Sequence, residues 1–240
     1  MEGVELVCLR AVPVAKTDNQ VMPFFSPRMF LQIRKFNPEF ILFLDPRFLA
    51  IQSIFLFRLF FGKRKLLATF HTDNFQYLKI LFGVPYFFSK WLHRIVFGNF
   101  SRIISVSDYC KNLLVQAGLK NCDGIWSGGL DTQLFHPEKR SESVRQSLLQ
   151  TGEHTLALHV GRLSREKGID RLVPLFAESK ARGVRWVIVG DGDDREALEA
   201  AAQGFPVTFV GKKYGDELAA LYASADFFAF PSTTDTFGLV

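Results

Sequence analysis

Short apolar runs alternate with longer stretches of helical periodicity along the whole chain, and this alternation constrains the fold most. The runs are "FILFL", "KLLATF", "RIISV", "LALHV", "RWVIV", "VTFV" and "FFAF". They are continuous in apolar character, which is typical of strands that are covered on both faces. The stretches between them are "PRMFLQIRKF", "PRFLAIQSIFLFRLFF", "DYCKNLLVQAG", "GIDRLVPLFAESKARG", "DREALEAAAQG" and "GDELAALYASA". This order predicts an α/β protein with parallel sheets.

A change in composition divides these elements into two sets. The polar stretch "GGLDTQLFHPEKRSESVRQ" separates a Phe-rich first set from a second set that is richer in Ala, Asp and Glu. A chain of 240 residues is long enough for two modest domains that each bury a core. We therefore expect an N-terminal domain over 1–136 and a C-terminal domain over 137–240. A ligand cleft would lie between the carboxyl ends of their strands.

Charge and aromatic content leave more than one kind of partner open. The net charge of +5 favours an anionic partner, whether a phosphorylated ligand, a lipid head group or nucleic acid, but no nucleic-acid-binding motif is recognisable. Many of the 26 Phe mix with Arg and Lys in "MFLQIRKF" and "SIFLFRLFFGKRK". Either basic side chains cap a Phe-rich core, or an apolar and basic face lies on an anionic membrane surface. The longest apolar stretch is interrupted by Asp45, Pro46 and Arg58, and fits a strand, a turn and a helix better than a membrane span.

The cysteines and the first residues give information about the cellular compartment of the protein. Cys8, Cys110 and Cys122 are odd in number and show no metal-ligand spacing, which suits a reducing compartment. The opening "MEGVELVCLR" lacks the basic and long apolar regions of a signal peptide. We expect a cytoplasmic protein without a metal site.

The stretch "LALHVGRLSREKGIDRLV" is the strongest candidate for a binding loop. A strand runs into Gly161, a basic loop follows, and a helix is expected to begin near Gly168. Arg162 and Lys167 would then lie at the carboxyl end of a strand, beside a helix N-terminus that also favours an anion. Two fixed cations match a diphosphate. A solvated basic loop that contains a chance glycine is the other interpretation.

The next strand ends in "VIVGDGDDREALEA", which partly matches a dinucleotide fingerprint. After Gly190 and Gly192 the third glycine position holds Arg195, and the acids of this stretch would repel a pyrophosphate. The pattern favours a tight turn that borders a ligand cleft over a nicotinamide site.

In the first half, "LLATFHTDN" places His71, Thr72 and Asp73 directly after a strand. Such a group is either structural or faces a cleft, and the sequence leaves both open. No nucleophile elbow or Ser-His-Asp order appears, which disfavours a nucleophilic hydrolase.

Five stretches in order carry a resemblance to a known family: "ATFHTDN", "IWSGGLDTQLFHPEKR", "HVGRLSREKGIDRLV", "VIVGDGDD" and "FPSTTDTFGLV". The sequence resembles the retaining GT-B glycosyltransferases of the large group, glycosyltransferase family 4-like, that includes phosphatidylinositol mannosyltransferases and sulfoquinovosyl transferases. The resemblance implies two Rossmann-like domains that face a cleft.

It also implies roles for particular residues. Arg162 and Lys167 match the pair that grips the diphosphate of a nucleotide sugar, and His71 matches a histidine beside the transferred sugar. Asp235 stands where a glutamate usually contacts sugar hydroxyls. Phe237 and Gly238 match a turn whose backbone N–H groups reach the donor. The remaining donor-site turns would include Gly161, Gly190, Gly192, Val210 and Gly211, the last two near the base.

The implied activity is metal-independent, retaining transfer of a sugar from a nucleotide diphosphate donor, with mannose from GDP-mannose favoured and no cofactor. The acceptor would be a lipid or a glycan, reached by a cytoplasmic enzyme resting on the inner face of the plasma membrane. Residues 3–9 resemble a later strand of the family, and its second acid would fall beyond Val240, so a piece truncated at both ends is expected. A catalytically inactive α/β fragment or a non-catalytic interaction module is the alternative.

Overall fold

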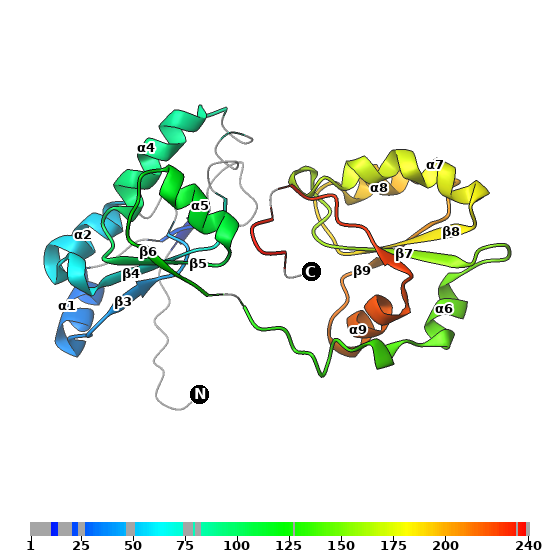
Figure 1. Ribbon diagram of the computed structural model, residues 1–240, viewed down its shortest axis with the longest axis horizontal. Helices are drawn as coiled ribbons and strands as arrows, with labels where there is room; N and C mark the ends of the chain where they lie inside the picture. The colour runs from blue at the N-terminus through cyan, green and yellow to red at the C-terminus, as the bar shows by residue number, and fades with distance from the viewer. Residues whose placement is uncertain are drawn as a thin grey trace. The chain divides into compact units, whose positions relative to one another are not determined.

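The computed structural model describes residues 11–13, 21–23, 27–46, 51–73, 79, 83–126, 128–233 and 235–238 (Figure 1). The chain separates into two compact units, Met1–Ser127 and Gly128–Val240. The domain limits expected from the sequence stay a prediction. The stretch 3–9 and Val240, on which the inference of truncation depends, lie outside the described residues.

The first unit is built on a parallel sheet whose strands lie side by side in chain order. They are β3 (Ile41–Phe43), β4 (Leu66–Phe70), β5 (Arg102–Ser105) and β6 (Cys122–Ile125). The helices are α1 (Pro27–Phe36), α2 (Ile51–Phe61), α4 (Tyr86–Phe97) and α5 (Asp108–Gln116), with a 3-10 turn at Lys63–Lys65. A separate antiparallel pair joins β1 (Ala11–Pro13) to β2 (Val21–Pro23). All loops that follow the sheet strands therefore leave from one edge of the sheet.

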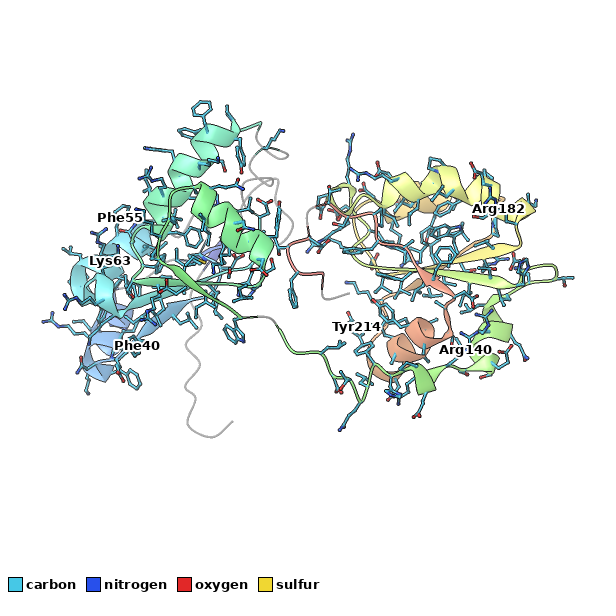
Figure 2. All side chains as sticks on the ribbon, in the orientation of Figure 1. Phe40, Phe55, Lys63, Arg140, Arg182 and Tyr214 are labelled. Atoms are coloured by element: carbon cyan, nitrogen blue, oxygen red, sulfur yellow. The ribbon has the colours of Figure 1, made fainter. Side chains whose placement is uncertain are left out.

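Phenylalanine fills much of the core of this unit and also covers part of its surface. Phe70, Phe97 and Phe100 are fully buried, and the rings of Phe70 and Phe97 meet edge to face at 5.2 Å. Other large apolar side chains are exposed, among them Phe40 and Phe55 (Figure 2). The expected Phe-rich core is present, and the expected membrane-facing surface stays a prediction. Within the described ranges, no helix is both long and apolar enough to cross a membrane.

The second unit is also a parallel sheet, but its strand order is not the chain order. The strands β7 (Thr155–Val160), β8 (Val184–Val189) and β9 (Val207–Gly211) follow one another, and β10 (Phe227–Phe228) pairs with the other side of β7. The helices are α6 (Glu142–Leu148), α7 (Val173–Ala181), α8 (Arg195–Ala201) and α9 (Gly215–Ser224), with 3-10 turns at Pro137–Lys139, Arg165–Lys167 and Ile169–Leu172.

Both faces of this sheet are covered, which explains the continuous apolar runs. Ala157, Trp186 and Ile188 face one core with α7 and α8, whereas Leu158 and Val187 face a second core with α9 (Figure 1). Successive residues of a strand point to opposite faces, so a strand buried on both faces must be apolar throughout. The predicted α/β fold with parallel sheets is confirmed.

One helix was not predicted, and another needed correction in detail. Helix α6 begins within the polar stretch, where Ser141 caps it by accepting a hydrogen bond from the Val144 N–H. The helix expected near Gly168 begins instead with a 3-10 turn, and α7 starts at Val173, because Pro174 fits the first helical turn, where its missing N–H has no intrahelical partner.

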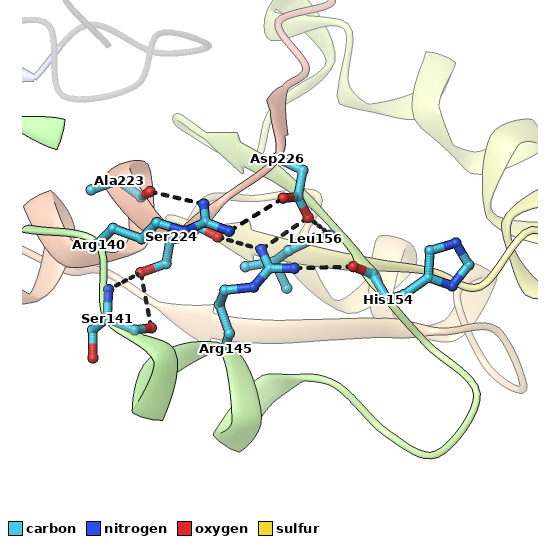
Figure 3. A network of polar contacts seen from close by, with 8 residues as sticks. All are labelled: Arg140, Ser141, Arg145, His154, Leu156, Ala223, Ser224 and Asp226. Atoms are coloured by element: carbon cyan, nitrogen blue, oxygen red, sulfur yellow. Dashed lines mark hydrogen bonds and ion pairs between the residues drawn. The ribbon is translucent and has the colours of Figure 1, made fainter.

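Arg145 ties the first helix of the second unit to the sheet (Figure 3). Its buried guanidinium donates to the backbone oxygens of Ser224 at 2.7 Å and His154 at 3.0 Å, and to Asp226 Oδ2 at 2.9 Å. The same carboxylate accepts from the Leu156 N–H at 2.7 Å. Burial alone would raise the pKa of Asp226, but these hydrogen bonds outweigh it and lower the pKa below its ordinary value.

We expect Arg145→Met to lower the free energy of unfolding by about 3–5 kcal/mol, because it leaves a half-buried carboxylate and two carbonyls without their donor. The matched change Arg140→Met, at a cation 3.6 Å from the same carboxylate and about half exposed, should cost less than about 1 kcal/mol. Urea denaturation measures both. Equal losses would contradict the role given to Arg145.

The depressed pKa of Asp226 also gives a pH dependence. A carboxylate whose pKa is lower in the folded protein contributes stability above its unfolded pKa and loses it as the pH falls through the folded pKa. Asp226→Asn should therefore flatten the loss of stability on acidification from pH about 5 downward.

Candidate functional site

The second unit has one place where the strand order reverses, between β7 and β10. The sheet continues to β8 and β9 on one side of β7 and to β10 on the other. Loops that leave the carboxyl ends of strands at such a reversal diverge and leave a crevice, which is where open α/β sheets bind ligands. Here the two loops are 161–168 after β7 and 229–238 after β10.

Contacts join these two loops. Lys167 Nζ donates to Asp235 Oδ1 at 2.8 Å, and Arg171 reaches the Pro231 carbonyl at 3.3 Å. Gly168 has φ +68°, and a Cβ there would lie 2.9 Å from the Pro231 oxygen. Only glycine combines this backbone conformation with so close an approach. The structure thus brings together Lys167 and Asp235, which the sequence singled out separately.

The Lys167 and Asp235 pair is arranged to meet a polar ligand. Their side chains are only 22% and 21% exposed. Asp235 Oδ2 is buried and accepts no hydrogen bond from any described residue. A buried acceptor without a donor costs free energy that a ligand hydroxyl or N–H would recover. A cation and a buried acceptor without a donor therefore lie side by side where the strand order reverses.

Arg162 lies on the same loop and is more accessible. Its side chain is 50% exposed and its Nη1 lies 3.7 Å from Glu166 Oε1. Glu166 in turn accepts from the Ser164 hydroxyl at 2.6 Å. An ion pair of this length and exposure contributes little, so an incoming dianion can compete for the guanidinium. Glu166 was not predicted from the sequence.

The turn that contains Gly190 and Gly192 packs against the loop after β7. A Cβ at Gly190, which has φ +138°, would overlap the Gly161 carbonyl, and one at Gly192 would overlap the Leu163 carbonyl. The Gly190 N–H donates to the Gly211 oxygen at 2.9 Å, which places the end of β9 beside the same turn. Gly161, Gly190, Gly192 and Gly211 thus meet at the carboxyl edge of the sheet, and Val210 precedes them on β9.

Phe237 and Gly238 line an apolar cavity within the second unit. It measures about 720 Å³ and is also lined by Phe135, Leu218 and Tyr222. Burial raises the pKa of Tyr222 to about 12, and its hydroxyl has no hydrogen-bond partner among the described residues. Val210 and Gly211 do not line this cavity.

In the first unit, a hydrogen-bond network fixes the loop that carries His71. Asp45, just beyond β3, accepts from the backbone N–H groups of His71 at 3.0 Å and Thr72 at 3.2 Å, and from the Thr72 hydroxyl at 2.6 Å. The Asp45 N–H donates to Thr69 Oγ1 at 3.1 Å. Asp45 has φ +45°, an uncommon conformation for a residue with a side chain, which is often found at functional sites.

Asp73 anchors the other end of this loop. It is buried, and its Oδ2 accepts a hydrogen bond from the Tyr109 hydroxyl at 2.6 Å. Burial and this bond raise the pKa of Tyr109. The His71 side chain itself is exposed. His71, Thr72 and Asp73 therefore differ in role: the last two hold the loop, and His71 is presented to solvent.

We expect Asp45→Ala to speed amide hydrogen exchange at His71 and Thr72 by about 10-fold or more, because a hydrogen bond to a charged group contributes about 1.5–3 kcal/mol. Asp45→Asn keeps one acceptor oxygen and should show a smaller increase. Exchange in Asp45→Ala at the wild-type rate would mean that the carboxylate does not hold the loop.

Among the described residues, no group of three or more His, Cys, Asp and Glu side chains is placed to hold a metal ion. Each unit therefore has its own candidate residues: cations, an acceptor carboxylate and glycine turns in the second unit, and the Asp45-anchored loop in the first.

Comparison with solved structures defines the class of fold. Anabaena HepE in complex with UDP and glucose matches with a TM-score of 0.61 and 21% identity, over 88% of this chain and 58% of that one. Sucrose-phosphate synthase from Thermosynechococcus elongatus matches with a TM-score of 0.65 and 22% identity, over 87% of this chain and 54% of that one. The fold is GT-B.

Family models identify the chain more closely. The model described as Glycosyltransferase Family 4 matches residues 4–134, and the model of Glycosyl transferases group 1 matches residues 140–240. The chain belongs to Glycosyltransferase Family 4.

Curated relatives agree with this family. Sulfoquinovosyl transferase SQD2 of Arabidopsis thaliana is 28% identical over 90% of this chain and 42% of its own length. A GDP-mannose-dependent alpha-mannosyltransferase of Mycobacterium tuberculosis is 31% identical over 98% of this chain and 59% of its own length. The chain thus spans about half the length of these relatives.

Proposed function

We propose that this chain belongs to an enzyme that transfers a sugar from a nucleoside diphosphate sugar to an acceptor hydroxyl, with retention of anomeric configuration. The observation that carries the proposal is the pair at the β7/β10 reversal, Lys167 bonded to Asp235 with one carboxylate oxygen left open. A diphosphate would take the cation, and a sugar hydroxyl would donate to the open oxygen. Arg162, Phe237 and Gly238 would complete the donor site.

The proposed mechanism is electrostatic. As the bond between the anomeric carbon and the phosphate oxygen breaks, negative charge builds on the leaving diphosphate, and Arg162 and Lys167 stabilise it. The acceptor oxygen bonds to the anomeric carbon on the same face and passes its proton to a phosphate oxygen. His71 and Asp235 orient the sugar. No metal ion is needed in this scheme, because the two side-chain cations meet the developing charge.

For the donor we propose GDP-mannose. Support comes from the GDP-mannose-dependent relatives, which include a second mannosyltransferase, of Corynebacterium glutamicum, 29% identical over 98% of this chain and 55% of its own length. Since the relatives also include a sulfoquinovosyl transferase, a test must offer UDP-sugars as well.

For the acceptor we propose a lipid or a glycan, with the first unit resting on an anionic membrane surface from the cytoplasmic side. The support is its exposed apolar side chains, Phe36, Leu59, Phe87 and Trp91, which are 54–81% exposed, beside a basic composition. Cys110 and Cys122 are buried and form no disulfide, as suits a reducing compartment.

The proposal is tested by incubating the chain with GDP-mannose, UDP-glucose or ADP-glucose and a bacterial lipid extract, and by following nucleoside diphosphate release and the labelled sugar. We expect release with GDP-mannose and label in the lipid phase. Transfer with another donor would correct the donor assignment. Absence of release, together with absence of nucleotide binding, would instead favour the non-catalytic module.

A further inference from the structure

We infer that a hollow in the first unit, at the edge of its sheet opposite the His71 loop, binds a phosphate group. The hollow measures about 430 Å³ and is lined by Lys63, Arg94 and Lys120, together with glycines at the ends of α4 and α5 and the backbone leading into β6. None of the described residues that line it is acidic. Its volume falls within the range of small-molecule sites, about 300–1,000 Å³.

The three cations have no polar side-chain partner among the described residues, unlike Arg58 and Lys65 nearby. Within the described part of the chain, the side chains of Lys63, Arg94 and Lys120 make no hydrogen bond or ion pair. Nearby, Arg58 donates to Asn99 Oδ1 at 2.6 Å, and Lys65 donates to the Pro38 oxygen at 3.0 Å. Three like charges around one hollow repel one another, and an anion between them would remove that cost.

The shape of the hollow suits the guanidinium as a binding group. A Cβ at Gly118 would lie 3.5 Å from Cζ and Nη1 of Arg94, so the guanidinium lies over a residue without a side chain. Arg binds phosphate oxygens in a two-pronged geometry, and Lys acts as a mobile point charge. One Arg and two Lys around an open hollow therefore fit a phosphate monoester or diester better than a carboxylate.

The position of the hollow separates it from the candidate functional site. Lys63 precedes β4 and Lys120 precedes β6, whereas His71 follows β4. Because these strands are parallel, the hollow lies at the amino edge of the sheet and the His71 loop at the carboxyl edge. The five residues of β4 alone span roughly 16 Å. A phosphate bound here would therefore lie at the opposite edge of this sheet from His71.

The cations also lie near helix carboxyl ends, where positive charge is favourable without any ligand. That arrangement would stabilise helices but would give no saturable binding. Binding measurements therefore separate the two explanations.

The experiment is isothermal titration of the full chain with inorganic phosphate, using the triple variant Lys63→Gln, Arg94→Gln, Lys120→Gln. The matched control, Lys111→Gln, Lys180→Gln, Arg182→Gln, removes the same charge elsewhere. We expect the first variant to weaken phosphate binding at least about 10-fold and the control to leave it unchanged. All six side chains are at least partly exposed, so both variants should keep the wild-type circular dichroism.

Arg162→Ala distinguishes this site from the proposed donor site, since phosphate binding at the hollow should persist in that variant. Equal binding in the two triple variants, or loss of phosphate binding only in Arg162→Ala, would overturn the inference. Flotation with phosphatidylglycerol vesicles, against phosphatidylcholine, identifies the source of the phosphate. Loss of flotation in the Lys63, Arg94 and Lys120 variant indicates a lipid head group, and unchanged flotation with weakened phosphate binding indicates a soluble phosphate ester.

Discussion

Replacing Arg162 with alanine is expected to lower the rate of sugar transfer at least about 10²-fold, and by as much as 10³-fold. The guanidinium lies on the loop after β7, its side chain is 50% exposed, and the proposed function has it meet charge that develops on a leaving diphosphate. Because that charge is largest in the transition state, kcat should fall more than the affinity for the nucleotide. Steady-state kinetics with the best donor measures both quantities.

Arg165→Ala is the matched control, since Arg165 lies on the same loop, is exposed, and has no place in the proposed site. We expect it to change kcat less than about 3-fold, as is usual for a surface charge. If Arg162→Ala is as active as Arg165→Ala, Arg162 does not bind the diphosphate.

The second large expected effect is on the stability of the second unit. Gly190→Ala should destabilise the second unit by about 3 kcal/mol or more, because alanine combines a disfavoured backbone conformation at φ +138° with an overlap against the Gly161 carbonyl. The turn cannot move away easily, since the Gly190 N–H is bonded to the Gly211 oxygen. Urea denaturation monitored by Trp186 fluorescence reports the change directly, because Trp186 is buried in this unit.

Gly204→Ala separates the two causes. Gly204 also has a positive φ of +79°, but a Cβ there meets nothing within 4 Å. We expect a loss of about 1 kcal/mol, the cost of backbone strain alone. If Gly190→Ala and Gly204→Ala destabilise the protein equally, close packing against the Gly161 carbonyl is not the reason why position 190 requires glycine.

The strands of the second unit were predictable because a strand that is buried on both faces is a continuous apolar run in the sequence. β7 and β8 send alternate residues to different cores, so their apolar runs are unbroken. The basic loop after β7 was predictable for a related reason, since polar residues at the end of such a run must lie at the edge of the sheet.

Helix α4 was missed because its buried positions mix polar and apolar residues. Ser89 and His93 are buried together with Val96 and Phe97, whereas Phe87 and Trp91 are exposed. The mixture weakens the hydrophobic periodicity that marks a helix in the sequence. The Pro85 that precedes the helix was the remaining local signal.

Asp45 was noted in the sequence only as a break in an apolar stretch. Its role depends on the register of β3 against β4, which places Asp45, two residues beyond β3, level with the end of β4. Pairing of Lys167 with Asp235 likewise depends on β10 lying beside β7. Neither contact follows from spacing along the chain, because each depends on which strands are neighbours.

The most direct test of the account is calorimetric titration of the chain with GDP, UDP and ADP, repeated on Lys167→Ala. The account predicts saturable binding of one nucleoside diphosphate, strongest for GDP, and a loss of at least about 10-fold in affinity in Lys167→Ala. Binding that is unaffected by Lys167→Ala, or absent for all three nucleotides, would contradict a donor site at the β7/β10 reversal.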